Sequence, residues 1–108
     1  MRLFILTLLL TLPLWGQTPV KNVQVLPYKT VEEIKPFMKG MAQSLGMKCR
    51  DCHDLNDKAL DTKKKRIARE MMKMVRTING EILPAIPVED RISCWTCHRG
   101  KHEPEERE

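Results

Sequence analysis

All four cysteines of this chain lie in two copies of one five-residue pattern. The first copy reads CRDCH, from Cys49 to His53, and the second reads CWTCH, from Cys94 to His98. The spacing C-x-x-C-H is the attachment signature of c-type haem. Two intervening residues let one short turn present both thiols to the vinyl groups on one porphyrin edge. The histidine that follows can then offer its imidazole to the iron.

We therefore expect two covalently bound haem c groups. The four thiols would form the thioether bonds, from Cys49 and Cys52 to one haem and from Cys94 and Cys97 to the other. Each iron would take one imidazole as an axial ligand, from His53 and from His98 respectively.

Two other uses of paired cysteines remain as a non-haem alternative. Four thiolates could bind one zinc ion, and each pair could form a disulfide in an exported protein. Neither use explains why a histidine directly follows both pairs. The repeated histidine therefore favours haem over a zinc or disulfide module.

The ligand on the opposite face of each iron separates an electron carrier from an enzyme. A methionine there favours the reduced iron, raises the potential and closes the iron to substrates. An open face would instead permit gas binding or peroxide chemistry, as in a small haem enzyme or sensor. The chain is short and offers no obvious distal acid–base group, so we predict an electron carrier rather than an enzyme.

Methionines precede each motif, and each can be a ligand or a packing residue. Before the first motif the candidates are Met38 and Met41, since Met47 is tethered only two residues from Cys49. Before the second motif the candidates are the three methionines of EMMKM, namely Met71, Met72 and Met74. Helical spacing places Met71 and Met74 in one stripe and Met72 in the neighbouring row. The spacing alone does not choose among them.

Two helices should carry these methionines. The stretch TVEE, residues 30–33, reads as a capping box, and apolar residues at helical spacing predict a helix to about Leu45 that ends at Gly46. Pro36 in its second turn should kink or restart that helix. The preceding stretch, residues 21–27, alternates weakly and predicts an extended lead-in with at most one strand.

A second helix should begin after Asp61 or Thr62, run to Asn79 and stop at Gly80. Its first turn is basic, from Lys63 to Arg66, which opposes the helix dipole. These cations, together with Arg69, could pair with haem propionates or form a docking face for an acidic partner. His102 reads as a free histidine in a loose acidic tail that starts near residue 101.

The segment 1–16 reads as a secretory signal peptide. Arg2 precedes a largely apolar run from Leu3 to Trp15, and Gly16 is the best candidate for the last residue removed. The protein would then be periplasmic or otherwise exported, which suits haem attachment outside the bacterial cytoplasmic membrane. An uncleaved leader would instead anchor it to the membrane.

The remaining residues, 17–108, form one dihaem cytochrome c domain in this interpretation. Their aromatic residues are few, Tyr28, Phe37 and Trp95, so a chain this small needs a stabilising group in its core. Two porphyrins would supply it. Without the leader, 18 Lys plus Arg face 14 Asp plus Glu, a mild excess without basic–aromatic interleaving that argues against nucleic-acid binding. The predicted fold class is mostly α, two helix–CxxCH units packed around two haems with little or no strand.

Four stretches, NVQVLP, LGMKCRDCH, KKRIAREMMKMVRTIN and CWTCHRG, together resemble the cytochrome c subunit of photosynthetic reaction centres, and more closely the small exported single-unit cytochromes related to it. The resemblance implies a mostly α-helical fold in which each haem lies along a helix that carries its axial methionine. It favours Met38 as the ligand that precedes Cys49 and Met72 as the ligand that precedes Cys94, with Met74 as a packing partner.

The resemblance also implies redox protein partners, among them a membrane-bound electron-transfer complex. The reaction-centre subunit carries four haems and a lipid-anchoring cysteine. This chain has two motifs and no such cysteine, so the match is to half of that subunit.

Overall fold

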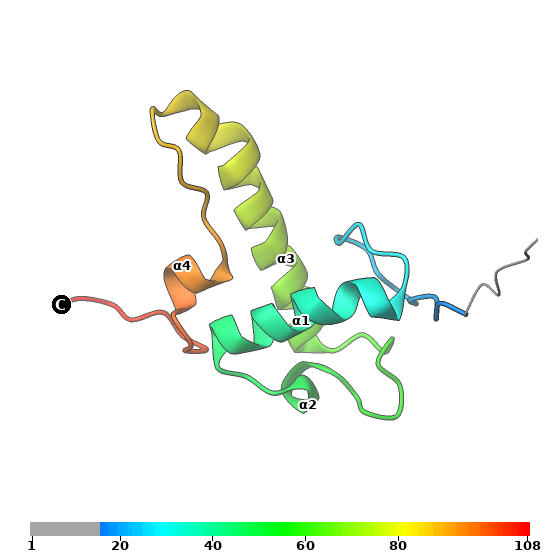
Figure 1. Cartoon of the computed structure of the whole chain (residues 1–108). Helices are drawn as coiled ribbons and strands as arrows, with labels where there is room; N and C mark the ends of the chain where they lie inside the picture. The colour runs from blue at the N-terminus through cyan, green and yellow to red at the C-terminus, as the bar shows by residue number, and fades with distance from the viewer. Residues whose placement is uncertain (1–15) are drawn as a thin grey trace, which may run out of the picture.

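The structure, a computed structural model, describes residues 16–108, so the predicted signal peptide lies outside the described residues except for Gly16. Figure 1 shows the chain as a set of helices joined by irregular segments. In chain order these are α1 (Val31–Leu45), α2 (Cys49–Cys52), α3 (Lys63–Thr77), a π-helical turn η1 (Ile78–Ile82), a 3-10 turn η2 (Leu83–Ala85) and α4 (Cys94–His98).

The predicted mostly α class is confirmed. Residues 16–108 contain no strand, and their β-type pairing is limited to an isolated bridge between Pro19 and Thr30. The lead-in before α1 is therefore irregular. No helix within residues 16–108 combines the length and the apolar character needed to cross a membrane.

Both predicted ends of α1 are confirmed. The Thr30 hydroxyl accepts from the backbone N–H of Glu33, and the Glu33 carboxylate accepts from the backbone N–H of Thr30 at 3.1 Å. Gly46 ends the helix in the left-handed region, at φ 61°. Of the kink or restart predicted at Pro36, the restart is wrong, because α1 runs through Pro36 without a break, and the kink stays a prediction. The proline ring removes one backbone donor, and a helix capped at both ends tolerates that loss.

The predicted start of α3 is confirmed at Thr62, whose hydroxyl accepts from the backbone N–H of Lys65 at 3.2 Å. The predicted stop at Gly80 is wrong, because the chain continues as η1 through Gly80 and then as η2. Asn79 supplies a reason. Its side-chain amide donates to the backbone C=O of Ile92 and accepts from the N–H of Ile92, both at 2.8 Å, so the returning segment holds this extra turn in place.

Two basic side chains of α3 fasten the lead-in to the rest of the chain. Arg69, whose side chain is 11% exposed, pairs with Asp61 at 2.8 Å and also reaches the backbone C=O of Asn22. Arg76 donates to the backbone C=O of Val25. Asn22 takes a left-handed φ of 58° and donates to Asp61 at 2.9 Å. Arg69 therefore has a structural role, and its interpretation as a propionate or docking group stays a prediction.

The side chains between the helices remain partly exposed. Among residues 16–108 no side chain is fully buried, and apolar residues on α3 such as Ile67, Met71 and Met74 are 49%, 45% and 46% exposed. A folded domain of this size ordinarily covers well over half of the surface of its extended chain. The helices thus present an apolar surface toward one another that their own side chains do not cover.

Replacing Thr62 by alanine should destabilise the protein by about 1–2 kcal/mol, the usual cost of losing a helix N-cap. The Thr62 hydroxyl also donates to the backbone C=O of Cys52 at 2.7 Å, so it joins α3 to the first motif. The free energy of unfolding, measured by denaturant titration of the haem-loaded protein, checks this. Thr62→Ser keeps the hydroxyl and should stay within about 0.5 kcal/mol of wild type. Equal losses in both variants would contradict the hydrogen-bond explanation.

Candidate haem-attachment site

Each C-x-x-C-H motif winds into one helical turn, the first as α2 and the second as α4. The same device starts both turns. The Asp51 carboxylate accepts from the backbone N–H of Lys48 at 2.7 Å, and the Thr96 hydroxyl accepts from the backbone N–H of Ser93 at 2.9 Å. Asp51 and Thr96 occupy the same position in the two motifs. Cysteines three apart on a helical turn lie on one side of it, as attachment to one porphyrin edge requires.

The two motif histidines are held in the same way. Nδ1 of His53 lies 3.0 Å from the backbone C=O of Lys58, and Nδ1 of His98 lies 3.0 Å from the backbone C=O of Lys101. A carbonyl oxygen can only accept, so Nδ1 carries the proton in each ring. Nε2, the other ring nitrogen, is thereby left to face a metal, and a neutral imidazole coordinates through such a nitrogen. This outer hydrogen bond is the usual partner of a metal-bound imidazole.

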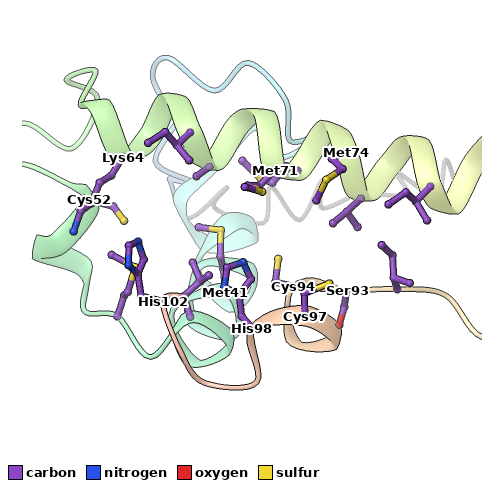
Figure 2. A pocket seen from close by; sticks show the side chains of 18 residues that line it. Met41, Cys52, Lys64, Met71, Met74, Ser93, Cys94, Cys97, His98 and His102 are labelled. Carbon is purple, nitrogen blue, oxygen red and sulfur yellow. The ribbon is translucent and has the colours of Figure 1, made fainter. Parts of the chain in front are cut away.

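A largely apolar cavity lies between α3, α4 and the C-terminal part of α1 (Figure 2). The second motif lines it with Cys94, Cys97 and His98, and the first motif with Cys52. In Figure 2, Met71 and Met74 extend from α3 toward the side of the cavity where Cys94 and His98 lie. The cavity therefore brings attachment thiols, an oriented imidazole and thioethers to one space.

The candidate sixth ligands fall in different places. Met71, Met72 and Met74 all line the cavity that His98 also lines, so every candidate of the second motif shares one space with its histidine. On α1, Met41 lines the cavity, whereas Met38 is half-buried one turn earlier and is not among the lining residues. Helical spacing in the sequence did not distinguish Met41 from Met38. The cavity does, because Met41 lines it and Met38 does not.

The thiols are chemically available for attachment. All four cysteines are free thiols in the structure, Cys52 and Cys94 being partly buried and Cys49 and Cys97 exposed. Partial burial raises the pKa of the Cys52 and Cys94 thiols, and the nearby Lys64 ammonium partly opposes this for the pKa of Cys52. Within residues 16–108 no three His, Cys, Asp or Glu side chains gather into a group that could hold a metal ion.

One feature near the site was absent from the sequence interpretation, and a second, His102, had been assigned to a loose tail. The backbone carbonyls of Lys58 and Lys101 orient the two motif histidines. Every residue has a backbone carbonyl, so the residue types at these positions do not indicate this role. His102 lines the cavity although its side chain is exposed, so it is placed at the site rather than in a wholly detached tail. Its position four residues after His98 was the available signal.

The first-turn cations of α3 are partly used within the chain. The Lys65 ammonium donates to the backbone carbonyls of Lys58 and Leu60, at 3.0 and 2.9 Å. These carbonyls offset the unfavourable placement of a cation at a helix N-terminus. Desolvation lowers the pKa of Lys65. The Lys58 carbonyl that accepts from Lys65 also accepts from Nδ1 of His53. The Lys65 ammonium is therefore engaged beside the histidine of the first motif and is not free to contact a partner.

The residues present fit haem c twice over: each motif places two thiols on one turn beside an imidazole whose Nδ1 is already engaged. This arrangement is that of a c-type cytochrome. More narrowly, the chain belongs to the photosynthetic reaction centre cytochrome c subunit family, whose family model matches residues 15–107.

A curated relative supports the same assignment. Cytochrome c-554 of Chloroflexus aurantiacus is 35% identical over 81 residues, which cover 71% of this chain and 20% of the relative. The chain thus spans about one fifth of the length of that protein. The resemblance in the sequence is confirmed: the chain belongs to a family of c-type cytochromes, and membership in it implies covalently bound haem c.

Proposed function

We propose that this chain is an exported dihaem cytochrome that passes single electrons between redox partners. The observation that supports it best is the repetition of the histidine geometry, Nδ1 against a backbone carbonyl at 3.0 Å, in both motifs. Two equivalent histidine–carbonyl contacts in one chain favour two haem-binding motifs over one haem-binding motif and one motif that has lost that role.

Each residue type has a defined role in this proposal. Cys49 and Cys52 attach the first haem, and Cys94 and Cys97 attach the second. The imidazoles of His53 and His98 bind the irons through Nε2, held by the carbonyls that follow them. When bound, the haem supplies the change of iron oxidation state that carries one electron.

We propose Met38 and Met72 as the sixth ligands, with Met41 and Met74 as the alternatives. Both named residues lie on the helix that precedes their motif, at the positions that the family resemblance favours. Met72 also lines the cavity that holds His98. Thioether ligation on both irons would raise their potentials and leave no open coordination position.

The proposed partners are redox proteins, including a membrane-bound electron-transfer complex. The proposed location is the periplasm or another site outside the cytoplasmic membrane, reached through the signal peptide at residues 1–16.

A haem enzyme or sensor with one open iron is the alternative, and one observation favours it. His102 lines the cavity and could act as the acid–base group that peroxide chemistry requires.

Carbon monoxide added to the fully reduced, haem-loaded protein separates the two functions. With both irons closed by methionine, the absorption spectrum should stay unchanged, and a reductive titration should consume two electrons per chain. A carbon monoxide adduct on either haem would show an open iron and contradict the proposed carrier.

A further inference from the structure

Two glycines join the beginning of the first motif to the end of the second. Gly46 ends α1 and lies three residues before Cys49, and Gly100 lies two residues after His98. The backbone N–H of Gly100 donates to the C=O of Ser44 at 2.8 Å. Figure 1 shows the segment that leaves α4 beside this end of α1. The exit from the second motif thereby satisfies one of the terminal carbonyls of α1, which lack partners within the helix.

The contact at Gly46 has no room for a side chain. A Cβ on Gly46 would lie 2.1 Å from the carbonyl oxygen of Gly100 and 3.0 Å from its carbonyl carbon. Both atoms belong to backbone, so no side-chain rotation can relieve the overlap. Gly46 also has a φ of +61°, which disfavours any residue with a Cβ. A larger residue at position 46 must therefore displace the backbone at Gly100.

The backbone at Gly100 is tied to the second motif on both sides. A Cβ on Gly100 would lie 3.5 Å from the ring of Trp95, which stands between the two attachment cysteines. The next residue, Lys101, provides the carbonyl that orients Nδ1 of His98. A shift of Gly100 would carry that carbonyl with it and rotate the imidazole that ligates the second iron.

We propose that Gly46 is a positioning residue for the second haem, although it lies beside the first motif in sequence. Because Gly46 has no side chain, the Gly100 backbone can lie against it, and the Lys101 carbonyl is then held against His98. This contact couples the two attachment motifs. The inference rests on the proposed haem ligation by His98.

The test compares Gly46→Ala with Gly40→Ala in the haem-loaded protein. Gly40 lies in the same helix, and a Cβ there would meet nothing within 4 Å, so alanine should be accepted without displacement. Gly46→Ala should keep two haems and shift the midpoint potential and electron paramagnetic resonance g values of the second haem. The signals of the second haem are assigned as those present in wild type and missing from the double variant Cys94→Ala, Cys97→Ala. Gly40→Ala should leave both haems as in wild type.

A shift confined to the first haem in Gly46→Ala, or no shift at either haem, would overturn the proposal. If Gly46→Ala yields no folded protein, Gly100→Ala replaces it, since its Cβ makes only ordinary contact with Trp95 but still strains φ at +82°. It should shift the same haem, and an unshifted second haem would overturn the proposal. Wild-type protein that carries no haem would refute the proposed function instead, so the two failures are distinguishable.

Discussion

A chain in which Cys94 and Cys97 are both replaced by alanine is expected to carry one covalent haem instead of two. The two thiols lie on one turn, α4, and no other cysteine is near enough in sequence to replace them. Absorbance in the main haem band per chain should fall by about half, and intact mass should fall by one haem. The apolar surface of α3 that the second haem would cover should then be left to solvent, so the free energy of unfolding should fall as well.

The chain offers its own matched control in the first motif. Cys49→Ala with Cys52→Ala should also remove one haem, but the haem that remains should be the one ligated by His98. The residual spectra of the two double variants should therefore differ and should together reproduce that of wild type. Retention of two haems by either double variant would contradict the assignment of one haem to each motif.

Met72→Ala is expected to abolish the methionine-to-iron charge-transfer band of the second haem and to lower its potential. Methionine favours the reduced iron, so its loss moves the potential downward. A fall on the order of 0.1 V is reasonable within the ~0.8 V range that axial ligands span. Near-infrared absorption of the oxidised protein and a redox titration measure the two effects.

Met71→Ala and Met74→Ala are the matched controls, because both side chains line the same cavity from the same helix. Each should keep the band and lose only packing, at less than the ~2–5 kcal/mol that a fully buried methionine would cost. Loss of the band in Met74→Ala, with the band intact in Met72→Ala, would assign the ligand to Met74 and refute our choice.

Local features of the fold were predictable because short-range chemistry decides them. The capping box of Thr30 and Glu33 and the left-handed end at Gly46 need only a few neighbouring residues, and both were predicted correctly. The α3 start at Thr62 is of the same kind. The motifs themselves specify their own turns through spacing and through the caps at Asp51 and Thr96.

Other features depend on segments distant in sequence and were missed for that reason. Gly80 has the residue type of a helix stop, yet the bonds from Asn79 to Ile92 keep the chain helical beyond it. Arg69 looked available for propionates, but Asp61 engages it. The contact of Gly46 with Gly100 joins the two motifs across half of the chain, and glycine at a helix end gives no sign of a backbone neighbour.

Among the ligands, the histidines were predicted from spacing, and the structure adds the carbonyls that orient them. From spacing the methionines were predicted only as sets, since a helical stripe serves packing and ligation equally well; the family resemblance then selected Met38 and Met72. The structure selects no single methionine for either iron: all three α3 methionines line the cavity, and on α1 the cavity is lined by Met41 but not by Met38.

The central claim, two haems attached through two motifs, is tested most directly by the intact mass of the full chain after export and purification under denaturing conditions. Covalent attachment predicts the mass of the polypeptide plus two haem groups, with or without the signal peptide. A mass with one haem or with none, or a polypeptide lighter only by the hydrogens lost in disulfide formation, would contradict the account.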